Sequence, residues 1–157
     1  MQMFTIKSSS EEYTYHCAMI LGELIDSPLS IGLIGDLGAG KTKFVQGLAY
    51  GLGIKVLPSS PTFILFSEYD GRVPMLHGDL YRVEENDLEN LDIEGQIEDW
   101  GGVSVVEWAN LFPEQFPLEM VWIEIKIREP SEREIAVRAT FDEGTKLISS
   151  WLSKCPE

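Results

Sequence analysis

The sequence has few cysteines, no long apolar run and no recognisable leader. Its two cysteines, Cys17 and Cys155, lie near opposite ends of the 157-residue chain, in neither a disulfide framework nor a metal-ligand spacing. No apolar run approaches the ~18 residues that a membrane helix needs. The N-terminus has no apolar run next to basic residues, the pattern of a cleaved signal. We therefore expect a cytoplasmic protein with reduced thiols and no membrane association.

Positive charge is also scarce. The chain has 12 Lys and Arg against 26 Asp and Glu, a net charge of -14. Proteins that bind nucleic acid gain affinity by neutralising phosphates with basic side chains, so we expect no direct binding of nucleic acid here. Between Glu84 and Glu107 there are nine acidic residues and no basic one. This stretch is either a solvated face or a surface that docks on a basic partner.

Length and hydrophobic content fit one folded domain. Hydrophobic residues make up 44% of the sequence, and we treat residues 1–157 as a single domain. Periodicity and breakers predict helical segments over residues 10–25, 41–53, 86–99 and 147–152. They predict strands over residues 29–34, 63–69, 73–81, 103–108, 120–127 and 134–141. This order predicts an α/β fold, with a mixed sheet flanked by helices, a parallel core and antiparallel strands added.

One motif has a specific chemical meaning. Gly35 to Thr42 read GDLGAGKT, which matches the P-loop pattern G-x-x-x-x-G-K-[ST] between a strand-like and a helix-like segment. Glycines let such a loop curl so that backbone N–H groups and the start of the next helix face phosphates. Lys41 then reaches the β- and γ-phosphates, and the Thr42 hydroxyl binds Mg²⁺. The motif predicts a P-loop NTPase-like fold and nucleotide contacts from Gly38, Ala39, Gly40, Lys41, Thr42 and Lys43.

A P-loop site also needs an acid at the tip of a neighbouring strand, for Mg²⁺ or its water. Two positions compete, because Glu107 ends the run VSVVE and Asp79 ends the run MLHGD. We expect both to serve, one near the metal and one near the attacking water. If residues 75–82 form a strand, His77, Asp79 and Tyr81 share one face. His77 then either holds Asp79 in place or faces a partner's site.

Together these residues resemble the TsaE (YjeE) family of small bacterial ATPases, which support synthesis of threonylcarbamoyladenosine on tRNA. The resemblance runs from about Glu12 to Phe141. Its marks are GDLGAGKT, SPTF at residues 60–63, HGDLYR at 77–82 and VEW at 106–108. It implies that Glu107 completes the Mg²⁺ site with Thr42 and that Asp79 is needed for hydrolysis, so that Lys41, Asp79 and Glu107 form the catalytic set.

The resemblance implies further roles. Thr62 lies in a switch-like loop, Arg133 approaches ATP from a hairpin near the C-terminus, and Thr14 lies on a helix that borders the base. It also implies that such a protein acts on a TsaB–TsaD complex, hydrolyses ATP slowly alone and faster there, and does not itself transfer the threonylcarbamoyl group.

Three alternatives differ in what they require. A small-molecule kinase usually carries an arginine-rich lid, whereas this chain has five arginines and no cluster. A GTPase switch would carry an N-K-x-D guanine motif, which the sequence lacks. A nucleotide-binding module without significant turnover would not need the set of Lys41, Thr42, Asp79 and Glu107, although a sequence cannot give a rate.

Overall fold

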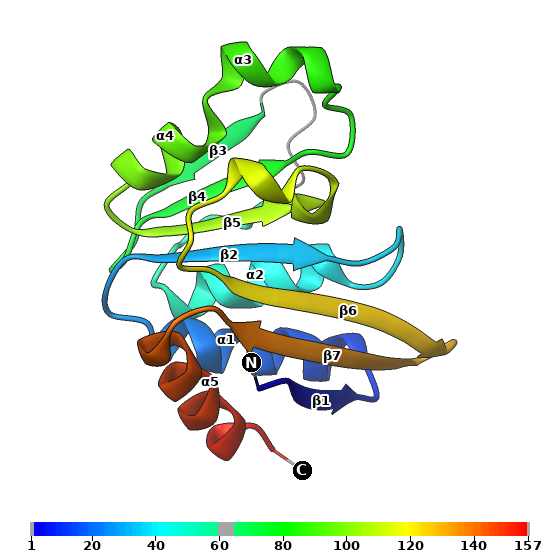
Figure 1. The fold of residues 1–157 in the computed structure, drawn as a ribbon. Coiled ribbons are helices and arrows are strands. Elements are labelled where there is room, and N and C mark those ends of the chain that lie inside the picture. The colour runs from blue at the N-terminus through cyan, green and yellow to red at the C-terminus, as the bar shows by residue number, and fades with distance from the viewer. Residues whose placement is uncertain (1, 60–64, 157) are drawn as a thin grey trace.

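A seven-stranded sheet runs through the protein in the order β1-β7-β6-β2-β5-β4-β3 (Figure 1). The structure is a computed structural model and describes residues 2–59 and 65–156. The central pairs β6–β2, β2–β5 and β5–β4 are parallel, and the outer pairs β1–β7, β7–β6 and β4–β3 are antiparallel. The predicted mixed sheet with a parallel core is confirmed. The strands are β1 (Phe4–Ser8), β2 (Leu29–Ile34), β3 (Phe66–Tyr69), β4 (Met75–Asp79), β5 (Val103–Glu107), β6 (Val121–Glu129) and β7 (Glu132–Ala139).

Helices cover both faces of the sheet. In Figure 1, α1 and α2 lie behind the sheet, α5 lies at its lower end, and α3 and α4 lie at the top beside β3. The α-helices are α1 (Glu11–Leu24), α2 (Lys41–Gly51), α3 (Leu88–Leu91), α4 (Ile93–Asp99) and α5 (Asp142–Lys154), and the 3₁₀ turns are η1 (Glu85–Asp87), η2 (Ala109–Leu111) and η3 (Pro113–Gln115). No helix among residues 2–59 and 65–156 is long and apolar enough to span a membrane.

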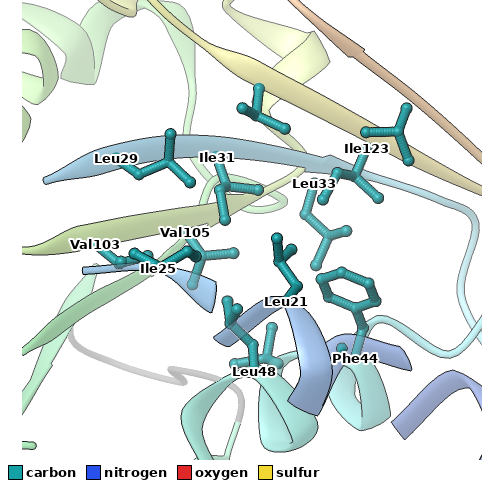
Figure 2. Packing of buried hydrophobic residues seen from close by; sticks show 14 of the residues in the cluster. Leu21, Ile25, Leu29, Ile31, Leu33, Phe44, Leu48, Val103, Val105 and Ile123 are labelled. Carbon is teal, nitrogen blue, oxygen red and sulfur yellow. The ribbon is translucent and has the colours of Figure 1, made fainter. Parts of the chain in front are cut away.

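The main core fills the space between the sheet and α1, α2 and α5. Figure 2 shows Leu21 of α1 and Phe44 and Leu48 of α2 directed toward side chains of β2 and β5. A smaller cluster on the opposite face joins β5 and Leu80, the residue after β4, to α4 and η2. Because β2 and β5 are covered on both faces, they read as apolar runs rather than as alternating strands.

The helix that carries the P-loop packs unusually close to α1. A Cβ atom added at Gly47 would lie 2.2 Å from the Tyr15 carbonyl oxygen, and one added at Gly51 would lie 2.1 Å from that of Met19. Any larger side chain would push the two helices apart. These glycines therefore fix the position of α2, and with it the loop at its N-terminus.

The N-terminal and C-terminal segments meet beneath this core. The Trp151 indole Nε1 donates a 2.8 Å hydrogen bond to the carbonyl oxygen of Cys17, and the Tyr13 hydroxyl donates one to the carbonyl oxygen of Pro156. The packing also brings the two cysteines together as free thiols. The hydrogen bond between them is the main cause that lowers the pKa of Cys17 and raises that of Cys155.

The structure differs from the predicted elements mainly at the edges. Strand β1 was not predicted, and it exists because residues 4–8 pair with residues 133–137 at the far end of the sequence. Helix α5 begins at Asp142, five residues before the predicted start. Strand β4 spans Met75–Asp79 rather than residues 73–81, so Tyr81 lies beyond the strand. Residues 63 and 64, with which the strand predicted over residues 63–69 begins, lie outside the described residues.

Candidate functional site

The P-loop has the backbone shape that its glycines predict. It connects the end of β2 to the start of α2, and Gly38 and Gly40 have φ angles of 81° and 110°. A Cβ atom at either position would meet nothing within 4 Å, so these glycines are required for their left-handed backbone and not for space. A hydrogen bond of 3.0 Å from Ala39 N to Asp36 O closes the turn.

The side chain of Lys41 lies folded against this loop. Its Nζ donates hydrogen bonds to the carbonyl oxygens of Gly35 at 2.5 Å and Asp36 at 3.0 Å. The ammonium also lies over the Trp108 ring, 4.7 Å from its centroid. Burial lowers the pKa of Lys41, while the negative charges of Glu107, Asp79 and Asp36 oppose that shift. The ammonium is therefore held by the loop's own carbonyl groups, and its contact with phosphates stays a prediction.

Two carboxylates meet at the carboxyl edge of the parallel sheet. Asp79 ends β4, Glu107 ends β5, and the two are direct partners in the β4–β5 register. The pairing of Glu107 with Leu33 in the β2–β5 register places the same edge beside the start of the P-loop. This is the edge of an open α/β sheet at which ligands bind.

The two carboxylates have different surroundings. Glu107 is 3% exposed, and its Oε2 lies 2.7 Å from Nε2 of His77, which is 1% exposed. Asp79 is only partly buried, and its Oδ1 accepts a 2.9 Å hydrogen bond from the backbone N–H of Tyr81. Burial is the main cause that raises the pKa of Asp79, and Glu107 adds to it, against the lowering effects of the Tyr81 N–H, His77 and Lys41.

Two cavities flank the P-loop. One, of about 390 Å³, lies on the carboxylate side and the other, of about 300 Å³, lies between the P-loop, the start of α1 and the β6–β7 hairpin. A triphosphate bound along the loop would have room on both sides. The first is lined by Glu11, Leu37, Gly38, Gly40, Lys41, Thr42, Lys43, Gln46, Asp79, Tyr81, Glu107 and Trp108, and the second includes Ser10, Thr14, Ala39, Pro130 and Arg133.

Residues 8–135 match the family model described as "Threonylcarbamoyl adenosine biosynthesis protein TsaE". The chain belongs to the TsaE family. A Bacillus subtilis protein named "tRNA threonylcarbamoyladenosine biosynthesis protein TsaE" is 47% identical over 108 residues, which cover 68% of this chain and 67% of that protein. A protein of the same name from Treponema pallidum is 39% identical over 132 residues, covering 83% of this chain and 96% of the relative.

The fold of this TsaE-family chain is also similar to a solved structure. The crystal structure of Bacillus subtilis YdiB superposes on this chain with a TM-score of 0.79. The two sequences are 33% identical, and the match covers 97% of this chain and 95% of that one. The similarity therefore extends over the whole sheet and its helices.

The two cavities are lined by most of the residues that the sequence and the TsaE resemblance single out. Lys41, Thr42, Asp79 and Glu107 share the larger one, Ala39 lines the smaller one, and Gly38, Gly40 and Lys43 line both. Thr14 lines the smaller cavity, and its place beside a base stays a prediction. Thr62 lies outside the described residues, so its role in a switch-like loop stays a prediction.

Arg133 lies at the P-loop, with its guanidinium turned onto the loop backbone. Its Nε donates to Ala39 O at 3.0 Å and one terminal nitrogen donates to Gly38 O at 3.3 Å. The other terminal nitrogen donates to carbonyl oxygens of the hairpin, those of Glu129, Pro130 and Glu132. Arg133 thus ties the β6–β7 hairpin to the P-loop, and its contact with a nucleotide stays a prediction.

Two contacts at this site were not foreseen. The ring of Tyr81 packs against that of Trp108 with centroids 4.9 Å apart, so that Tyr81 and Lys41 both contact Trp108. Gln46 of α2 donates a 3.2 Å hydrogen bond to the carbonyl oxygen of Pro58 and holds Pro58 beside α2. The HGDLYR and VEW motifs contained the aromatic residues, but their spacing does not show that the rings meet.

Proposed function

We propose that this chain is a Mg²⁺-dependent ATPase required for threonylcarbamoyladenosine modification of tRNA, and that it acts on a TsaB–TsaD complex without transferring the group itself. The observation that carries the proposal is one cavity that collects the P-loop residues Lys41 and Thr42 and the strand-end carboxylates Asp79 and Glu107. Membership of the TsaE family supplies the biological process.

The P-loop supplies the phosphate contacts. Its left-handed glycines let the loop curl so that backbone N–H groups can face phosphates, and the N-terminus of α2 adds the positive end of its dipole. The ammonium of Lys41, now bonded to two loop carbonyls, would exchange these bonds for stronger ones to phosphate oxygens. Asp79, with its raised pKa, is suited to orient the attacking water.

The oxygen ligands at the cavity fit Mg²⁺. No group of three or more His, Cys, Asp or Glu within residues 2–59 and 65–156 could hold a metal by itself. Mg²⁺ commonly binds with only one or two protein oxygens, the others coming from phosphates and water. Thr42 and Glu107 would provide these oxygens. When bound, the ion would neutralise charge that develops on the phosphates.

The rim of the cavity supports action on a protein partner. Leu37 and Tyr81 line the cavity and are 68% and 49% exposed. Apolar side chains at the mouth of a site are suited to a protein contact. The net charge of -14 disfavours direct binding of tRNA and favours a basic protein surface.

The decisive experiment is ATP hydrolysis by the purified protein, alone and with the TsaB–TsaD pair. We expect a slow rate alone and a faster one with the pair, since a partner can complete a site or fix a loop. GTP should be hydrolysed more slowly than ATP, and Lys41→Ala should remove the activity, which excludes a contaminating enzyme. Equal rates with and without the pair would refute the assembly-factor role, and binding of ATP without turnover in either case would favour the binding module.

A further inference from the structure

The carboxylate of Glu107 is held by the side chain of His77, a contact that none of the predicted roles includes. His77 lies two residues before Asp79 on β4, on the same face of the sheet. In the parallel β4–β5 register Glu107 lies opposite Asp79, while His77 lies opposite Val105. The Glu107 side chain therefore leans back along the sheet to reach His77, with 2.7 Å between Oε2 and Nε2.

The direction of this hydrogen bond follows from the chemistry of the two groups. The oxygen of a carboxylate accepts hydrogen bonds and has none to give. Nε2 of His77 must therefore carry a hydrogen and donate it. The other ring nitrogen, Nδ1, is buried and has no partner among the described residues. Among residues 2–59 and 65–156, the hydrogen bond of the His77 ring therefore goes to Glu107 through Nε2.

We propose that His77 is a positioning residue for Glu107. By binding Oε2, the imidazole fixes the rotation of the carboxylate and leaves Oε1 for the cavity. Without this donor, Glu107 would be free to turn toward the nearby ammonium of Lys41, and an ion pair there would draw both groups away from Mg²⁺ and phosphate. This inference rests on the proposed function, because it concerns the carboxylate assigned to Mg²⁺.

The same geometry argues against both roles that the sequence left open for His77, which were to hold Asp79 in place or to face a partner's site. A residue that is 1% exposed does not face a partner protein. Asp79 is held instead by the Tyr81 backbone, through the 2.9 Å bond to Oδ1. His77 therefore acts on the carboxylate of the neighbouring strand.

Two substitutions at His77 form a matched pair. In His77→Gln the side-chain amide nitrogen is as many bonds from Cα as the imidazole Nε2 and can donate to Glu107. In His77→Asn the amide nitrogen corresponds to Nδ1 and is too short to reach. Both are polar and uncharged and carry the same amide group, and the one methylene by which they differ decides whether that amide reaches Glu107.

We expect His77→Asn to lower kcat and to weaken the Mg²⁺-dependent gain in ADP affinity, each about 10-fold to 100-fold, as for other groups that orient metal ligands. Affinity for ADP without Mg²⁺, measured by calorimetry, should change less than about 2-fold, because the P-loop is intact. His77→Gln should recover most of both losses. Equal behaviour of the two variants, or Mg²⁺ dependence unchanged in His77→Asn, would overturn the proposal.

A double-mutant cycle separates positioning from a general effect on stability. In a Glu107→Gln background, His77→Asn should have little further effect on the Mg²⁺-dependent gain in ADP affinity, whereas independent, additive losses would overturn the role. Thermal unfolding of each variant shows that the measured molecules are folded. If the wild type binds Mg²⁺ and ADP but never hydrolyses ATP, the proposed ATPase fails while the binding cycle still tests His77. An active wild type with an unaffected His77→Asn refutes only the role of His77.

Discussion

Arg72 joins the C-terminal ends of the two helices that position the P-loop. Its guanidinium donates hydrogen bonds of 2.9 Å to the carbonyl oxygens of Ile25 and Gly22 at the end of α1, and one of 3.1 Å to that of Gly51, the last residue of α2. A cation there also complements the negative ends of both helix dipoles. We therefore predict that Arg72→Ala destabilises the fold.

The size of the effect follows from these three bonds. A net contribution of about 1 kcal/mol for each bond gives about 3 kcal/mol, and because Arg72 is exposed, water would replace part of this, leaving about 2 kcal/mol. For a chain of 157 residues this corresponds to a fall in Tm of about 4–8 °C.

Thermal and urea unfolding at pH 7 would measure the loss, with Arg72→Lys as the matched control. Lysine keeps the charge, but one ammonium cannot span both helix ends, so it should recover less than half of the loss. ATP turnover per folded molecule should stay unchanged in Arg72→Ala, since the P-loop lies at the opposite end of α2. A loss below about 0.5 kcal/mol, within the usual range for a surface substitution, or full recovery with lysine, would refute the bridging role.

Three further predictions concern the site and its surroundings. Thr42→Ala should lower Mg²⁺-dependent ATP turnover about 10-fold or more while Thr42→Ser retains it, because only the hydroxyl can bind the metal; unchanged turnover would contradict the site. Asp79→Asn should abolish hydrolysis yet raise Tm at pH 7: burial raises the pKa of Asp79, so its contribution to stability is present at low pH and is lost as the pH rises through that pKa. The gain in Tm should therefore disappear on acidification, and a gain that is independent of pH would contradict this origin. Charge reversal at Glu94 and Glu98, exposed on α4, should weaken binding to the TsaB–TsaD pair measured by calorimetry, whereas unchanged binding would leave that stretch a solvated face.

The parallel core and the P-loop could be predicted because their signals are local. The apolar run of β2, the glycines of the loop and the amphipathic start of α2 follow one another within one short segment of the sequence. Strand β1 gave no comparable signal, since its five residues become a strand only by pairing with β7, more than 120 residues later. The close approach of α1 and α2 was also hidden, because Gly47 and Gly51 read as ordinary glycines of a helix until the partner helix is known.

The candidate site was predicted as a set of residues but not as an arrangement. The motifs named Lys41, Asp79 and Glu107, yet neither the contact of Lys41 with the Trp108 ring nor the turn of Arg133 onto the loop carbonyls follows from spacing. Such contacts depend on side-chain directions across several strands. Motif residues can therefore identify a site without showing which groups hold one another in place.

The two strand-end carboxylates show this limit most clearly. Asp79 and Glu107 both end short strand-like segments, MLHGD and VSVVE, and the sequence of each segment by itself does not separate their roles. Their difference arises one strand away, because the parallel register sets His77 diagonally beside Glu107 and leaves Asp79 with a backbone N–H at the more exposed end. Two neighbouring carboxylates can have different functions because their environments differ. A buried, side-chain-bonded Glu107 is suited to hold a fixed position, and a partly exposed Asp79 with a raised pKa is suited to meet water.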